Sequence, residues 1–489
     1  MQPVSFACLA LLLLGAWCPP MAVQAEVRET HYTGGALHER FEIDAEGRKA
    51  GLYERFREDG SIEQRAHYLA DNLHGESTEF DATGQPVSIS HFARGLRQGS
   101  YEQYAGGRLV QRARFVKDKL DGRLEAFDEN GDSILVAEYR AGELNGKFIE
   151  MRPAEDWKRT AKYKAGRLDG NAKIEVKGKT ISKRVWVEGR LAELDGNIAF
   201  PTPFADLYKE WSAAALPAPV DPSDLQSAAR QGELARLKTY RALCGLPWRD
   251  LVLVPEWNDL CDAAGELLHR IGRLDHTPAK PEGMDEEAYR RGYQGTSNSN
   301  LASGGLRGSV DMYMDDSDAS NIDRIGHRRW CLNPAMQRTG FGSKGQWAAM
   351  WSMDSSGPGV KSMEAVLYPP RGYTPVDMFG PRHAWSIQVI KGKMPADKES
   401  IVVHIFELDH YHQAIGEALP LDYKDIEGGG FGGLPCVAFR PGGLVVQPGR
   451  CYRAQVSFDG GKTLAYDYVV EFCPALDKLD PELVEMEGR

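Results

Sequence analysis

Several chemical signatures are missing from this sequence of 489 residues. It has no CxxC pair, which argues against a redox motif or a zinc knuckle. It has no G-x-S-x-G phrase, no P-loop and no G-x-G-x-x-G turn that leads from a strand into a helix. These absences exclude the commonest nucleophilic and nucleotide-dependent enzyme classes.

Positive charge is in the minority. The chain has 59 Lys and Arg against 70 Asp and Glu, a net charge of −11. A general nucleic-acid binder needs a basic face, so we expect no nucleic-acid partner. Residues 26–196 carry 29 basic and 31 acidic residues, and the rest of the chain carries a net charge of −9. The nearly neutral first part does not favour electrostatic attachment to a membrane.

The apolar run near the start is too short to span a bilayer. Phe6–Trp17 contains 12 residues, whereas a span needs about 20. Prolines end the run, and the small-x-small phrase 23–25 follows, although no Lys or Arg precedes the run. The pattern predicts a signal peptide over 1–25, cleaved after Ala25, and a secreted or periplasmic protein.

Cysteine is confined to the signal and the second half of the chain. An even number of six follows the predicted signal: Cys244, Cys261, Cys331, Cys436, Cys451 and Cys473. An even set in an oxidising compartment allows up to three disulfides. Six buried free thiols are the alternative, and spacing alone does not decide between them.

Residues 27–196 repeat with a period of 23 or 24. The period is marked by six glycines and six aromatics: Gly51, Gly75, Gly99, Gly122, Gly146 and Gly170, with Tyr68, Phe92, Phe115, Tyr139, Tyr163 and Trp186. Polar and apolar residues alternate within each unit, which predicts strands, and turn phrases join them into hairpins that stack on their neighbours. We expect the aromatics to fill the buried face.

The glycine and aromatic landmarks resemble those of the MORN-variant repeat family. The resemblance implies a scaffold that contacts a protein or an envelope component. A spacer that only holds other domains apart is the alternative. The proline-rich stretch 197–222 that follows predicts a linker. Helical periodicity resumes after Ser223 and Asp224 and again from Trp257 to Ile271.

Four phrases then occur in order. They are YRALCGLP (Tyr240–Pro247), RLDHTP with His276, SNLASG with Ser299 and Asn300, and GHRRWCLNPAMQRTGFG with His327. Together they resemble the CAP superfamily, the SCP domain of cysteine-rich secretory and pathogenesis-related proteins. The resemblance implies a CAP-like domain over 223–365, folded as an α-β-α sandwich.

The resemblance also implies a cavity that gathers two histidines and two acids. The candidate cavity residues here are His276, Ser299, Asn300, Asp316 and His327. Ser299 stands where the family has Glu, and Asp316 is a shorter substitute for the second acid. His276 and His327 are the candidate ligands of a weakly bound divalent metal such as zinc.

Two other roles remain open for this region. Both histidines can be hydrogen-bonded cavity residues without a metal, and the cavity can bind a small apolar ligand, as the resemblance implies. Arg328 and Arg329 are expected to clamp the acidic segment 315–318 through bidentate contacts rather than to recognise an anion.

The last part of the chain changes to short strands with turns. Residues 366–475 predict a β-sandwich and resemble the Ig-like modules of bacterial surface proteins. His410 and His412, two residues apart, are expected on one side of an extended strand. Residues 476–489 predict an acidic, solvated tail.

The sequence therefore predicts a multidomain chain with a β-hairpin repeat array, an α-β-α sandwich and a C-terminal β-sandwich. The expected function is that of an exported bacterial CAP-domain protein that acts as a binding or interaction module without catalysis. The alternative is a metal-assisted hydrolase that uses the His276 and His327 cavity.

Overall fold

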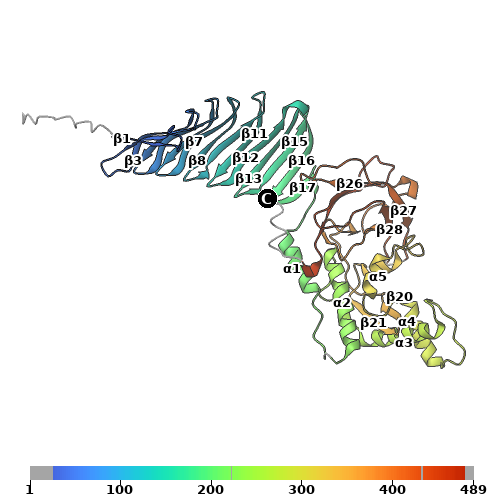
Figure 1. Ribbon diagram of the computed structural model, residues 1–489. Helices are drawn as coiled ribbons and strands as arrows, with labels where there is room; N and C mark the ends of the chain where they lie inside the picture. The colour runs from blue at the N-terminus through green and yellow to red at the C-terminus, as the bar shows by residue number, and fades with distance from the viewer. Residues whose placement is uncertain (1–25, 222, 431–432, 479–489) are drawn as a thin grey trace, which may run out of the picture. The chain divides into compact units, whose positions relative to one another are not determined.

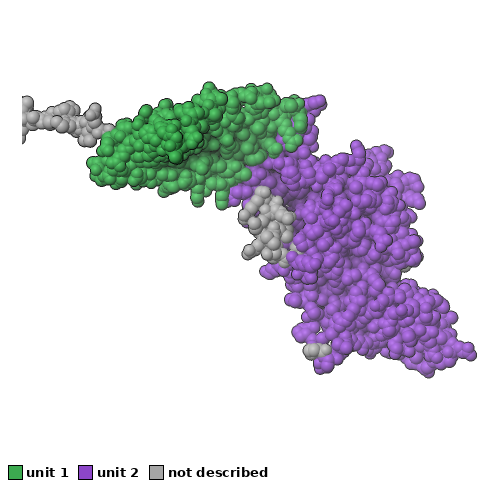
Figure 2. Space-filling view, in the orientation of Figure 1, with its two compact units in different colours: residues 1–156 green, residues 157–489 purple. Residues whose placement is uncertain are grey.

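The fold is given by a computed structural model that describes residues 26–221, 223–430 and 433–478. The predicted signal peptide 1–25 and most of the predicted tail lie outside the described residues. The chain divides into two compact units, 1–156 and 157–489, which Figure 2 colours green and purple.

Unit 1 consists of antiparallel hairpins (Figure 1). Most strands pair with the next along the chain, and β8 pairs with both β9 and β10. The strands are β1 (Glu26–His31), β2 (Leu37–Ile43), β3 (Lys49–Phe56), β4 (Ile62–Leu69), β5 (Asn72–Phe80), β6 (Pro86–Ala93), β7 (Leu96–Ala105), β8 (Arg108–Val116), β9 (Lys119–Leu120), β10 (Gly122–Phe127), β11 (Ser133–Arg140) and β12 (Glu143–Arg152). The β-rich repeat expected here is confirmed.

The turns show why the repeat keeps its period. At one end of the hairpins, two-residue turns such as Ala70-Asp71 and Lys117-Asp118 have positive φ at both positions. This twist matches that of the flanking strands. At other turns, Asp44, Asp81 and Asp128 each accept two backbone N–H groups through one carboxylate oxygen. Local hydrogen bonds therefore set each hairpin.

The periodic glycines have a backbone reason. All six have φ between 94° and 128°. Gly99 lies in a bulge of β7 opposite His91, where the register between β6 and β7 shifts. A Cβ on Gly99 would lie 3.0 Å from the Cβ of His91. Only glycine combines this φ with this close approach.

Unit 2 contains further strands and all six α-helices of the described residues. Its first strands continue the hairpin pattern: β13 (Trp157–Lys164), β14 (Arg167–Leu168), β15 (Gly170–Val176), β16 (Lys179–Val187), β17 (Arg190–Leu194) and β18 (Asn197–Ile198). The helices are α1 (Phe204–Ala214), α2 (Leu225–Leu243), α3 (Pro255–Ile271), α4 (Glu286–Ser297), α5 (Ser309–Asp315) and α6 (Gly326–Cys331).

A small four-stranded sheet lies among these helices. Its order is β19 (Val252–Leu253), β21 (Arg338–Lys344), β22 (Trp347–Trp351) and β20 (Ser299–Ser303). Helix α3 packs closely on β21, because Gly342 leaves room for its backbone: a Cβ there would lie 2.2 Å from the Asp262 nitrogen. This approach accounts for the G-F-G phrase 340–342.

Two more four-stranded sheets complete unit 2. One has the order β23 (Ala365–Tyr368), β25 (Trp385–Val389), β28 (Cys436–Pro441) and β27 (Leu421–Glu427), and the other has the order β24 (Gly372–Pro375), β30 (Tyr466–Cys473), β29 (Cys451–Ser457) and β26 (Val402–Leu408). Trp385, Phe439, Tyr452 and Phe472 are fully buried in one core that both sheets share. The β-rich character expected of 366–475 is confirmed.

The predicted fold class is wrong. The described chain is mostly β, with antiparallel hairpin strands β1–β12 in unit 1 and β13–β18 in unit 2 and only 18% helix, and it is not built on an α-β-α sandwich domain. The hydrophobic core explains the error. Leu237 of α2, Tyr313 of α5 and Phe341 of β21 belong to the same buried cluster as Trp385 and Tyr452. Helical periodicity located helices but did not show that they share the core of the C-terminal sheets.

Two further expectations differ from the structure. The stretch expected as a linker contains α1, whose Phe204 and Trp211 are buried in the core of unit 2. All six described cysteines are buried free thiols, so the expected disulfides are not formed. Burial raises the pKa of Cys244 and Cys261 to about 12, which keeps these thiols protonated and unreactive.

Candidate functional site

The two candidate histidines belong to a compact polar cluster in unit 2. His276 follows the end of α3, which Gly272 terminates with a left-handed φ of 72°. The Nδ1 atom of His276 lies 3.1 Å from the carbonyl oxygen of Thr296, and the Thr296 hydroxyl donates to the carbonyl of His276 at 3.1 Å. This reciprocal contact fixes the His276 loop on the last turn of α4.

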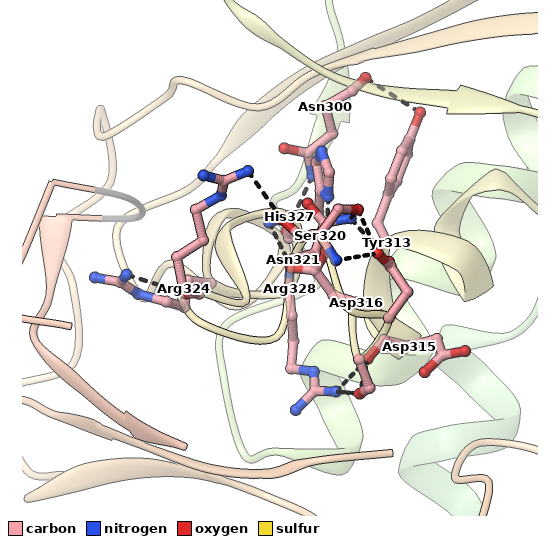
Figure 3. Close-up of polar contacts among 12 residues, drawn as sticks. Asn300, Tyr313, Asp315, Asp316, Ser320, Asn321, Arg324, His327 and Arg328 are labelled. Carbon is pink, nitrogen blue, oxygen red and sulfur yellow. Dashed lines mark hydrogen bonds and ion pairs between the residues drawn. The ribbon is translucent and has the colours of Figure 1, made fainter. Parts of the chain in front are cut away.

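His327 is held by Asp316, as Figure 3 shows. One carboxylate oxygen of Asp316 lies 2.8 Å from Nδ1 of His327, and the other accepts the backbone N–H of His327 at 2.9 Å and of Arg328 at 3.3 Å. The Asp316 side chain is almost fully buried. Its three contacts orient the imidazole and leave Nε2 as the nitrogen that can act.

The imidazoles of His276 and His327 are near each other, with ring centroids 6.4 Å apart and a 30° angle between the ring planes. The Tyr313 ring lies 5.8 Å from that of His327. Burial lowers the pKa of His276, and the charge of His327 lowers it further. His276 is therefore held mainly as the neutral imidazole.

Asn300 contacts His327 and Tyr313 of this cluster, whereas Ser299 contacts Cys261. The Asn300 amide donates to the carbonyl of His327 at 3.0 Å, and Tyr313 donates to the carbonyl of Asn300 at 3.1 Å. The Ser299 hydroxyl lies 3.6 Å from the thiol of Cys261 in α3. Successive side chains of β20 point to opposite faces, so the neighbouring residues have different surroundings.

The loop that connects Asp316 to His327 begins and ends with strained residues. Asp316 has φ of 43° and Ile325 has φ of 39°, both left-handed. A β-branched residue rarely adopts this conformation. Between them, Asp318 accepts from Ser320 and Asn321, and Arg324 donates to Ser320 (Figure 3). Such strain often occurs where a side chain must be placed accurately.

The arginine pair anchors backbone rather than carboxylates. Arg328 is fully buried and donates to the carbonyls of Met314 at 2.7 Å and Ala384 at 2.6 Å, and to that of Asp315. Arg329 donates to the carbonyl of Arg324 at 3.2 Å and to that of Leu434. The expected contact of Arg328 with segment 315–318 is therefore made, but not in the expected bidentate form with its acids.

The donor set around the histidine pair does not fit a three-ligand zinc site. Asp316 contacts His327 at Nδ1, so it orients the imidazole and is not placed as a third ligand. Among the described residues, no third His, Cys, Asp or Glu side chain converges with this pair.

The sequence motifs identified the main residues of this site but not the residues that hold them in place. Thr296 and Tyr313 were not expected to contribute, and Asp316 was expected as a cavity acid. A left-handed Asp at the end of a short helix has no simple sequence signature.

A groove of about 390 Å³, lined by Leu216, Leu234 and Leu251 among others, lies beside α2.

Comparison with known proteins does not assign this chain to a family. No family model matches it, and no curated protein matches. Among solved structures, the crystal structure of a mutant of S. aureus TarM in complex with fondaparinux, alpha-GlcNAc-glycerol and UDP aligns at 15% identity and a TM-score of 0.13. The alignment covers 22% of this chain and 19% of that chain, and such a low score carries no argument about fold or function.

Among the described residues, no helix combines the length and the hydropathy that crossing a membrane requires.

Proposed function

We propose that this chain is an exported interaction protein and that its hairpin array, residues 27–196, is the surface that contacts a protein of the cell envelope. The resemblance of the repeats to MORN-variant proteins favours a binding role, and the predicted signal peptide favours export. The histidine pair contributes a second, smaller polar site within unit 2.

One observation carries the proposal: several array strands bury no side chain, so a partner can reach their side chains. Strands β1, β7 and β12 of unit 1 contain no buried residue. The array also exposes large apolar side chains, among them Leu69 at 51% and Leu96 at 44%. Both flank two-residue turns, at Ala70-Asp71 and Arg94-Gly95. We take these two apolar side chains as the contact positions that a partner protein would bury.

The contact is tested by site-specific photo-crosslinking in the source cells. A photoreactive residue replaces Leu69 or Leu96 in the array and, as matched controls, Leu274 or Leu464 of unit 2, which are 44% and 52% exposed. We expect one discrete adduct from both array positions and none from the controls. Equal adducts from all four positions, or none from the array, would contradict the proposal.

Export is tested separately. The mature protein recovered from the periplasm or medium should begin at Glu26. Recovery of the chain only from the cytoplasm with Met1 retained would contradict export without affecting the crosslinking result.

A further inference from the structure

A cavity of about 490 Å³ lies in unit 2, away from the histidine pair described above. Its lining includes aromatic side chains (Trp186, Phe200 and Tyr373) and two groups with metal-binding chemistry, His412 and Glu471. Every lining residue lies within 157–489, so the cavity belongs to one compact unit.

Strand register places a cysteine beside Glu471. In the ladder between β29 and β30, Cys451 lies directly opposite Glu471, and in the ladder between β26 and β29 it lies opposite Leu408. Tyr373 of β24 is the partner of Glu471 on the other side. Side chains directly opposite in neighbouring strands share a face of the sheet. The thiol of Cys451 and the carboxylate of Glu471 therefore point the same way.

A tight turn brings His412 to the same place. Strand β26 ends at Leu408, and the chain then turns, with Asp409 accepting the N–H groups of Tyr411 and Gln413 at 2.8 Å. His412 has a left-handed φ of 56°, which is rare for histidine. His410 and His412 therefore lie in a turn, and the expected extended strand does not continue through them. The two-residue spacing of these histidines therefore does not explain where His412 lies.

The imidazole of His412 is fixed by its neighbours. The Trp186 ring meets it edge to face at a centroid distance of 5.5 Å, and the Phe200 ring lies at 6.3 Å. Its Nδ1 atom is buried and has no hydrogen-bond partner among the described residues. A buried ring nitrogen without a partner is costly unless a ligand satisfies it.

The three side chains converge. One ligand atom each from His412, Cys451 and Glu471 lies within 4.8 Å of the other two. In a tetrahedral zinc site with bonds of 2.0–2.3 Å, neighbouring ligand atoms are about 3.3–3.6 Å apart. Side-chain adjustments of about 1 Å would complete such a geometry.

We propose that His412, Cys451 and Glu471 bind one Zn²⁺ ion, with the fourth coordination position open to the 490 Å³ cavity. Imidazole nitrogen, thiolate sulfur and carboxylate oxygen are the three ligand types that zinc uses in proteins. Three protein ligands with one open position form the arrangement of a reactive zinc rather than a closed structural one.

The charges of the ligands themselves match a divalent cation, whereas the cavity beside them is lined by Arg159, Arg167 and Arg190. Burial, and then the charge of Arg184, lower the pKa of His412 to about 4, so its imidazole is neutral at physiological pH. Burial, and then Glu471, raise the pKa of the Cys451 thiol, which is protonated without a metal. Zinc binding would release that proton to solvent, and thiolate plus carboxylate would then balance the two charges of the ion. The buried Arg184 opposes the cation, and Asp195 and Asp409 offset Arg184.

The test uses the untagged full chain, freed of metal with a chelator. Titration with Zn²⁺ should show one ion per chain by calorimetry and elemental analysis, with one proton released near pH 7. Titration with Co²⁺ should give the near-ultraviolet thiolate-to-metal band and the visible bands of a tetrahedral site.

Matched variants assign the ligands. Cys451→Ala should abolish the thiolate band, and His412→Asn, which tolerates the left-handed φ, should weaken Zn²⁺ binding by at least about 100-fold. The controls are Cys473→Ala and His410→Ala, which change a nearby buried thiol and a nearby histidine. Both should bind zinc as the unchanged chain does. Thermal unfolding of each metal-free variant verifies that it folds.

Several results would overturn the proposal. The unchanged chain could bind less than stoichiometric Zn²⁺, folded Cys451→Ala could keep the thiolate band, or Cys473→Ala could lose it. If Cys451→Ala does not fold, His412→Asn and Glu471→Gln decide by the same measurements. Retention of the full affinity by both would exclude the site.

Discussion

The hairpin strands of unit 1 and most C-terminal strands of unit 2 have the same secondary structure but differ in how many of their residues are buried. Strand β7 has no buried residue in ten, whereas all five residues of β25 are buried. Turns and cross-strand neighbours stabilise the first kind of strand, and a shared core stabilises the second. Strand content alone therefore says little about how a β region is stabilised or what surface it leaves for partners.

The largest effect on stability is expected when one aromatic residue from each region is replaced by alanine. Trp385→Ala removes a fully buried side chain that contacts Phe379, Phe439 and Tyr468, and it should cost about 3–5 kcal/mol of unfolding free energy. Tyr101→Ala, which removes an edge-to-face contact with Phe115, should cost about 1–2 kcal/mol. Denaturant unfolding of both variants measures the costs. Equal losses would mean that the array has a core comparable to that of the C-terminal sheets.

Acid should destabilise unit 2 through His383. Burial, and then the charge of Arg328, lower the pKa of His383 to about 4, and Asp315 opposes this shift. Between pH 6.5 and 4 the unfolded state then binds more protons than the folded state, so stability falls as pH falls. At pH 5 the loss should be about 2 kcal/mol.

Replacing the histidine checks the assignment. His383→Gln should flatten the fall in stability between pH 7 and 5, measured by denaturant unfolding with chelator present so that metal binding does not contribute. The matched control is His67→Gln, at an exposed array position, which should leave the slope unchanged. A slope that is the same in His383→Gln and the unchanged chain would contradict the prediction.

The two regions also differ in how much of them the sequence predicted. A fixed period with glycine landmarks is a local signal, and Gly99 shows its cause, since the φ and the close approach to His91 both involve residues less than one repeat apart. The predicted hairpins therefore agree with the structure. In unit 2 the core joins residues such as Leu237 and Tyr452, more than 200 positions apart, and no local pattern reports such a contact. The predicted α-β-α sandwich failed for that reason.

The candidate sites divide in the same way. The motifs located His276 and His327, which the structure brings to a centroid distance of 6.4 Å. They did not show that Asp316 orients His327, because that contact depends on two left-handed residues. The group His412, Cys451 and Glu471 was missed because its members meet through strand register and one turn, although they are 39 and 20 positions apart along the chain.

A smaller effect is expected from the glycine period. Gly99→Ala should destabilise the array by about 1–2 kcal/mol, because alanine at a φ of 126° is strained and its Cβ would lie 3.0 Å from His91. Gly34→Ala is the control, since a Cβ at Gly34 meets nothing within 4 Å. Hydrogen exchange of β6 and β7 amides should rise in the first variant only. Unchanged exchange in Gly99→Ala would show that the period does not reflect a backbone requirement.

The smallest effect tests how far one hairpin influences the next. The Tyr53 hydroxyl donates to Glu39 at 2.7 Å, and Tyr53→Phe should cost about 0.5–1 kcal/mol by removing that partly buried hydrogen bond. In an array where each hairpin depends mainly on its neighbours, hydrogen exchange should rise in β2, β3 and β4 and stay unchanged in β10–β12. The β25 and β28 amides of unit 2 serve as the reference. A uniform rise across all strands of unit 1 would show that the array opens as one cooperative body, and its difference from the C-terminal sheets would then be one of burial alone.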